Sequence, residues 1–237
     1  MIAITGDTAR RGNNGELLAA ELIKKKILDQ WPEMENNQDR IKLIVSPNFN
    51  HGLRTETDIL LIADFKNPKK IKLPFTATKT IDEKRKIKAK ELWIQNILCV
   101  IEVKSCDQKR LILKEGGDLW FKYQGKTTPK NISYQNSGQV WALQDTINFD
   151  PLSKSKPFIT KFIYLPNSRF DRPLFDVYGN NHSWNWIVSC IASSMFRIGK
   201  REFDKNNKRY IYSCFDKKHA EYFYKAAYIP EHDFSAL

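Results

Sequence analysis

Ile97-Leu98-Cys99-Val100-Ile101-Glu102-Val103-Lys104 is an apolar run that ends in a carboxylate and an amine. Its length and its β-branched residues predict a buried strand. Because side chains alternate along a strand, Glu102 and Lys104 should point to the same face, roughly 7 Å apart at their backbones. Charged groups are costly to bury in a core without partners. We therefore predict a functional site at the end of this strand.

An earlier apolar run has acidic residues at its start. In Glu56-Thr57-Asp58-Ile59-Leu60-Leu61-Ile62-Ala63, alternation puts Glu56 and Asp58 on one face. On adjacent strands about 4.8 Å apart, Asp58 and Glu102 could together bind Mg²⁺ or Mn²⁺, which would relieve their mutual repulsion. Lys104 could then hold an attacking water or stabilise the transition state of phosphodiester hydrolysis. Alternatively, Asp58 and Glu16 only form ion pairs with Lys104 that close the sheet.

Two helices are predicted on either side of these strands in the sequence. Residues 15–28 have apolar positions at helical spacing, and Glu16 lies in the first turn. Glu16 could contact a metal or its water, or it could simply stabilise the helix N-terminus. Residues 131–147 form the second predicted helix, with Gln135 and Gln139 along one face; Gln135 could orient Lys104 or a phosphate oxygen.

The remaining elements complete one α/β domain. Residues 1–168 are predicted as the core, and residues 169–237 as a C-terminal α/β extension. Residues 1–14 are expected to be a mobile segment. Further strands are predicted at 41–45, 111–113, 119–123, 158–165 and 210–215, and further helices at 183–199, capped by Ser183, and from Asp216 onward.

The 237 residues carry a net charge of +12. This surplus indicates a polyanionic partner, nucleic acid before a membrane, although a basic surface exposed to water is the simpler alternative. No apolar run reaches membrane-spanning length, and we expect no membrane association. The four cysteines are scattered and form no metal-binding or disulfide pattern. We expect a cytoplasmic protein.

A strongly basic stretch separates the two acidic strands. Residues 66–90 contain ten lysines and arginines against only Asp82 and Glu83, and we predict an insertion spanning about 66–93. Thr80 and Glu83 fit a capping box, which predicts a short helix there. The insertion is either an arm that contacts nucleic acid or a solvated excursion. The candidate nucleic-acid-binding residues are Arg10, Arg11, Lys84, Arg85, Lys86 and Lys88.

The order helix-Glu, strand-Asp, strand-Glu-x-Lys resembles the PD-(D/E)xK nuclease superfamily, and within it the nuclease-related domain (NERD). The matching pieces are Gly15-Glu16, Glu56-Thr57-Asp58, Ile101-Glu102-Val103-Lys104, Trp120 and Asn131-Ile132-Ser133-Tyr134-Gln135. They span roughly residues 8–165. Ile132 stands where the family usually has proline, and residues 66–90 lengthen the segment between Asp58 and Glu102.

The resemblance implies a restriction-endonuclease-like fold, with a mixed sheet, a short central hairpin and flanking helices. It also implies that the backbone carbonyl of Val103 is a further metal ligand. The function expected is a Mg²⁺- or Mn²⁺-dependent nuclease that acts on DNA, or alternatively on RNA.

Two alternatives remain open. Arg11-Gly12 followed by Glu16 also resembles the start of Holliday-junction resolvases, which would imply a symmetric homodimer. The chain could instead be a non-catalytic nucleic-acid-binding module of a helicase or ATPase assembly. Because no Walker-type motif is present, the motor would then lie in a partner or in a longer parent chain.

Overall fold

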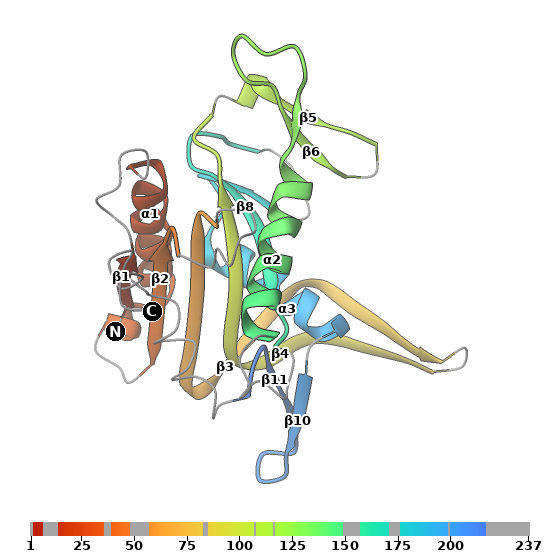
Figure 1. The fold of residues 1–237 in the computed structure, drawn as a ribbon. Coiled ribbons are helices and arrows are strands. Elements are labelled where there is room, and N and C mark those ends of the chain that lie inside the picture. The colour runs from red at the N-terminus through yellow and green to blue at the C-terminus, as the bar shows by residue number, and fades with distance from the viewer. Residues whose placement is uncertain are drawn as a thin grey trace.

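The computed structural model describes residues 2–6, 14–35, 39–47, 57–82, 85–106, 108–115, 117–148, 157–170, 176–198 and 200–216. These residues form a mixed α/β fold with an eight-stranded sheet, a three-stranded sheet and three α-helices (Figure 1). The large sheet contains β1 (Ile2–Gly6), β2 (Arg40–Val45), β3 (Ile59–Asp82), β4 (Arg85–Val103), β8 (Thr160–Leu165), β9 (Val177–Gly179), β10 (Lys200–Asp204) and β11 (Arg209–Ser213). The small sheet contains β5 (Leu111–Leu113), β6 (Leu119–Phe121) and β7 (Lys130–Asn131). The helices are α1 (Asn14–Gln30), α2 (Ile132–Asn148) and α3 (Trp184–Ile198), with short 3₁₀ turns at Pro32–Glu35 and Gln108–Arg110.

Strand β4 lies at the centre of the large sheet. It pairs antiparallel with β3 along one edge, while its other edge is shared by β11 and β8, which both run parallel to it. Ile97 through Ile101 are fully buried, which confirms the predicted buried strand. Strands β3 and β8 both pair with the last residues of β4, so these two neighbours fix where its C-terminal end lies.

The three helices pack on this sheet as their apolar patterns predict. Helix α1 buries Ile23 and Ile27, and α3 buries Ile187 and Ile191. The backbone N–H of Trp186 donates to the Ser183 hydroxyl at 3.3 Å, as expected of the predicted helix cap. The helices predicted at 15–28, 131–147 and 183–199 are thus confirmed to within a few residues.

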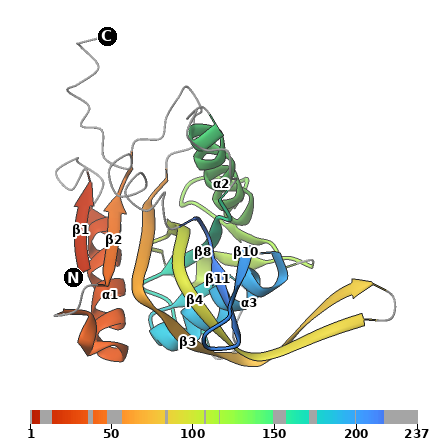
Figure 2. The same cartoon turned by 90° about the horizontal axis from the view of Figure 1, so that it is seen from below.

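The β3–β4 hairpin is far longer than the short hairpin that the family resemblance implies. Residues 77–80 of β3 pair with residues 86–89 of β4, so the short helix expected after Thr80 is wrong. Backbone pairing between two strands outweighs a local capping signal, and threonines such as Thr76 and Thr78 favour strands. Both views show the two strands leaving the body together as an arm (Figures 1 and 2).

The expectation of a mobile N-terminal segment is wrong for residues 2–6. They form β1, which pairs in parallel with β2 from Ile2↔Ile41 to Gly6↔Val45. Gly6 has φ of 103°, and a Cβ there would lie 2.1 Å from the Val45 carbonyl oxygen. Only glycine permits this close approach. An isolated five-residue run gave no sign of its distant partner.

The C-terminal segment contributes strands to the same sheet. The Asn96 side chain, fully buried in β4, accepts hydrogen bonds from the backbone N–H groups of Cys214 (2.7 Å) and Phe215 (3.1 Å), and donates to the Phe215 carbonyl (2.8 Å). Three bonds from one amide thus fasten the end of the β11 segment to β4. The helix predicted from Asp216 onward lies outside the described residues.

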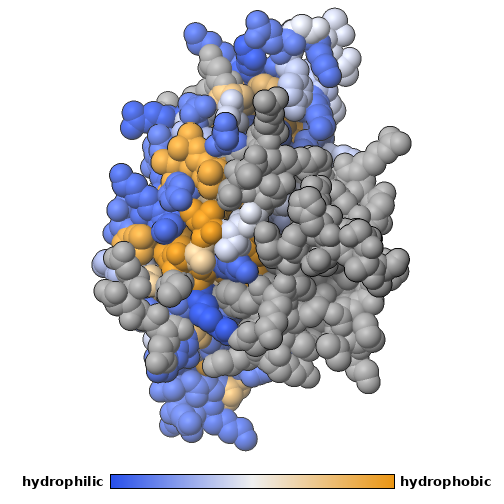
Figure 3. All heavy atoms as spheres, turned by 60° about the vertical axis from the view of Figure 1, so that its left-hand side comes forward, coloured by the Kyte–Doolittle hydropathy of each residue, from blue (hydrophilic) through white to orange (hydrophobic). Residues whose placement is uncertain are grey.

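Figure 3 shows the side of the molecule nearest α1, where hydrophobic residues form a central band between hydrophilic regions. Leu18 of α1 is 54% exposed. No helix in the described part of the chain is long and apolar enough to cross a membrane.

We predict that Asn96→Ala lowers the free energy of unfolding by about 2–4 kcal/mol, because it strands buried backbone groups of residues 214 and 215. Urea unfolding measures this loss. Asn67→Ala, which truncates an exposed asparagine of β3, is the matched control and should cost less than about 0.5 kcal/mol. Equal losses in the two variants would contradict the role of Asn96.

Candidate active site

Asp58 and Glu102 lie opposite each other at the end of the β3–β4 pair where β3 begins and β4 ends. The pairing of Ile59 with Ile101 makes Asp58 and Glu102 the next opposed residues. The backbone N–H of Val103 donates to Asp58 Oδ2 at 2.7 Å, which fixes the carboxylate against the end of β4. The predicted juxtaposition of the two acids is therefore present in the structure.

The Lys104 ammonium lies at a point where three oxygen atoms converge. It forms an ion pair with Glu102 Oε1, lies 3.3 Å from the Val103 carbonyl oxygen, and lies 4.0 Å from Asp58 Oδ2. The side chains of Glu102, Asp58 and Lys104 are 0%, 14% and 15% exposed. The three oxygens are those predicted to hold a metal ion, and here they surround a cation supplied by the chain itself.

The glutamine that reaches this cluster is Gln139. It donates from Nε2 to Glu102 Oε2, whereas Gln135 was the predicted residue. Both lie on α2, one turn apart, and α2 packs over β4 and β8 so that the later turn lies above Glu102. Gln135 keeps a buried Oε1 with no hydrogen-bond partner among the described residues. Their shared helical face was visible in the sequence, but the register of α2 over the sheet was not.

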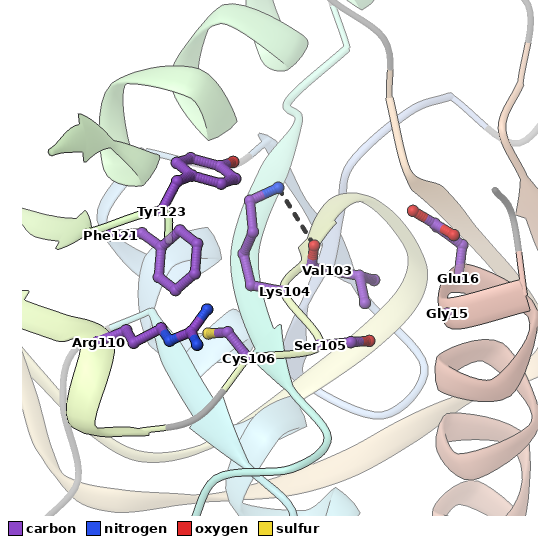
Figure 4. Close-up of a pocket in the computed structure, with 9 residues that line it drawn as sticks. All are labelled: Gly15, Glu16, Val103, Lys104, Ser105, Cys106, Arg110, Phe121 and Tyr123. Carbon is purple, nitrogen blue, oxygen red and sulfur yellow. Dashed lines mark hydrogen bonds between the residues drawn. The ribbon is translucent and has the colours of Figure 1, made fainter. Parts of the chain in front are cut away.

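A cavity of about 660 Å³ connects this cluster to α1. Figure 4 shows Glu16 extending from the start of α1 and Lys104 from the end of β4, with the Val103 carbonyl between them. A Cβ on Gly15 would lie 3.0 Å from Ser105 Oγ, so glycine lets α1 begin close to the end of β4. Glu16 Oε2 is buried and has no hydrogen-bond partner among the described residues. Figure 4 shows the Glu16 carboxylate extending from α1 toward Val103.

The small sheet forms the opposite wall of the cavity. Phe121 and Tyr123 line it, together with Arg110 from the turn before β5. The arginine brings a fixed positive charge to the cavity, as expected of a site for a phosphate. These residues were not predicted, because their place beside Lys104 depends on how the small sheet packs on the large one.

The two carboxyl groups are held in conditions that disfavour their charge. Burial raises the pKa of Asp58 to about 7, and the nearby Glu102 and Glu16 add to this rise while Lys104 opposes it. Burial likewise raises the pKa of Glu102, against the effect of Lys104. Although burial alone lowers the pKa of Lys104, the attraction of Glu102 and Asp58 outweighs it and raises that pKa. An additional cation would favour ionisation of both acids.

The donor set fits Mg²⁺ or Mn²⁺. No cluster of three or more histidine, cysteine or acidic side chains able to hold a metal occurs in the described ranges. Mg²⁺, however, needs only one or two carboxylates and keeps several waters. Asp58 and Glu102 supply two carboxylates, and Val103 supplies a carbonyl oxygen. Glu16 lines the adjoining cavity.

The other predicted site residues lie either outside the described residues or, for Lys88, far along the arm. Arg10, Arg11, Glu56 and Lys84 lie outside the described residues, and so do the side chains of Arg85 and Lys86. Lys88 is exposed on β4 in the arm, away from the acids.

No protein-family model matches the chain, and no match was found among curated proteins or among solved structures. The geometry of the cluster is therefore the basis for a functional proposal.

We predict that Asp58→Asn becomes more stable relative to the unchanged protein as pH rises from about 4 to about 7. A carboxyl whose pKa is raised by folding stabilises the fold while it is protonated, and that contribution is lost as pH rises through its folded-state pKa. Without added metal, the gain at pH 8 should be about 1–4 kcal/mol over its value at pH 4. Urea unfolding across this pH range checks it; a difference between the two proteins that does not change with pH would contradict the burial of Asp58.

Proposed function

We propose that this protein is a Mg²⁺- or Mn²⁺-dependent nuclease that hydrolyses phosphodiester bonds in DNA, with a restriction-endonuclease-like core. The observation that carries the proposal is the convergence of Asp58, Glu102 and the Val103 carbonyl on one cationic group. A buried acid and a partly buried acid with raised pKa values are costly to a fold, and such groups are found preferentially at functional sites.

In this proposal Asp58, Glu102 and the Val103 carbonyl would hold the metal ion. When bound, the ion supplies charge neutralisation at the phosphate and acidifies water near neutral pH. The ammonium of Lys104 leaves the three oxygens and turns toward the cavity, where it orients the attacking water or stabilises charge on the phosphoryl oxygens. Water adds to phosphorus and one P–O ester bond breaks, giving a phosphate monoester and an alcohol.

The other groups at the cluster have supporting roles. Gln139 fixes one oxygen of Glu102 and leaves the other directed at Lys104. Glu16 is placed to accept a hydrogen bond from a water in the cavity, and Arg110 to contact a phosphate oxygen. The ion-pair cluster alone also fits a nucleic-acid-binding module without turnover, and a cleavage assay separates the two.

We predict that the purified protein nicks supercoiled plasmid with Mg²⁺ or Mn²⁺ and not with EDTA. Lys104→Ala and Asp58→Ala should each reduce the rate by at least about 100-fold, because each removes a group that stabilises the transition state. Gel analysis of the plasmid forms over time measures these rates.

Asp64→Asn is the matched control for this assay. Asp64 is a buried acid of β3, and its carboxylate pairs with Arg40 at 3.1 Å, away from the cavity. The control should keep its cleavage rate within about threefold. Cleavage that survives Lys104→Ala would place the active site elsewhere, and DNA retardation without cleavage under any metal would favour the binding module.

A further inference from the structure

The β3–β4 arm is a two-stranded antiparallel ribbon that projects from the body of the molecule (Figures 1 and 2). Its described side chains belong to residues 66–78 and 88–93. They include six lysines and a single carboxylate, Glu91. A projecting ribbon with this charge balance attracts a polyanion, and its form limits which polyanion fits.

The base of the arm is anchored to the body. Lys69 forms ion pairs with Asp39 at 3.2 Å and with Glu33 at 3.1 Å, and the Ser189 hydroxyl of α3 donates to the Lys72 carbonyl at 2.6 Å. Ile71 of β3 and Leu92 of β4 are buried. Because the base is fixed in this way, binding through the arm has less conformational entropy to lose.

Beyond this base the exposed side chains have two kinds of chemistry. Lys88 and Lys90 are exposed, and the cross-strand partner of Lys88 is the exposed Thr78. Phe75 is 52% exposed, although Leu73 and Ala77 on either side of it in β3 are buried. Lysines suit phosphates, whereas an exposed ring and threonine methyl groups suit the apolar edges of bases, such as the thymine methyl group.

The shape of the ribbon favours duplex DNA over other polyanions. The major groove of B-DNA is about 12 Å wide and admits a two-stranded ribbon, whereas the major groove of duplex RNA is too narrow and deep for side chains to read. Single-stranded nucleic acid is usually bound by successive aromatic side chains. The described arm has two aromatic rings: Phe75 is exposed, whereas the Trp93 ring is covered by Lys70 and Arg209 at the base.

We propose that the β3–β4 arm lies in the major groove of duplex DNA, with Lys88 and Lys90 on the phosphates and Phe75 against base edges. The inference names the substrate class of the proposed nuclease and in that respect rests on the proposed function. Twenty residues of β3 separate Asp58 from Thr78, which is at most about 70 Å of extended chain, or about 20 base pairs of duplex. One duplex can therefore occupy the arm and reach the cleavage site.

We predict two separable effects on binding of the full chain to a fluorescent 30-base-pair DNA duplex in EDTA. Lys88→Gln/Lys90→Gln should weaken binding and reduce the slope of log affinity against log salt by about 1–2, because each phosphate contact contributes about 0.9. Phe75→Ala should weaken binding at least threefold and leave the slope unchanged, since it removes no charge. Fluorescence anisotropy at several salt concentrations measures both.

Lys25→Gln is the control, because it removes one exposed lysine from α1 on the body. It should leave the slope within the error of the unchanged protein, whereas Lys88→Gln alone should lower it. Equal slopes for Lys25→Gln and Lys88→Gln would overturn the proposal. The proposal would also be overturned if a 30-nucleotide single strand or a 30-base-pair RNA duplex bound as tightly as the DNA duplex. A change in oligomeric state as the only effect of the arm variants would overturn it as well. Binding is measured in EDTA, and cleavage is measured separately with metal. Arm-dependent binding without cleavage would therefore refute the nuclease and leave the proposal for the arm standing.

Discussion

The interaction on which the site depends is the contact of one ammonium, that of Lys104, with the buried carboxylate of Glu102 and the partly buried carboxylate of Asp58, where β3 begins and β4 ends. Burying any of these charges alone would cost several kcal/mol, so the Lys104 ammonium favours the ionised form of both acids. The rest of the fold places them: β8 and β11 fix one edge of β4, β3 brings Asp58 to the other, and α2 adds Gln139. The same arrangement makes the cluster sensitive to any competing cation.

The proposed function uses two parts of the molecule, the Asp58–Glu102–Lys104 cluster and the β3–β4 arm. The cavity of about 660 Å³ is lined by Glu16, Lys104 and Arg110, and Lys104 joins it to the carboxylates of Asp58 and Glu102. The arm provides charge and an exposed ring far along the same two strands. Because β3 and β4 carry both, a duplex held by the arm in the proposed complex would be positioned relative to the cluster by the same two strands.

Much of this could be predicted from the sequence, because the signals are local. Helical periodicity gave the three helices, and the apolar run at 97–104 gave the buried strand with Glu102 and Lys104 on one face. The features that were missed depend on contacts between distant parts of the chain. Ile2–Gly6 is a strand because it pairs with β2, and the arm forms because β3 pairs with β4. Gln139 rather than Gln135 contacts Glu102 because of where α2 lies on the sheet. Asn96 was hidden for the same reason, since its partners lie about 120 residues away.

The most direct test of the central claim is a calorimetric titration of Mn²⁺ into the unchanged protein, Lys104→Gln and Asp58→Asn, without DNA. If the oxygens around Lys104 form a metal site, the unchanged protein binds saturably and Lys104→Gln binds at least as tightly, because the competing ammonium is gone. Asp58→Asn should then bind at least tenfold more weakly. The contradicting result is no saturable binding to the unchanged protein, or equally tight binding to Asp58→Asn and the unchanged protein. The cluster would then be an ion-pair network that closes the sheet and not a metal site.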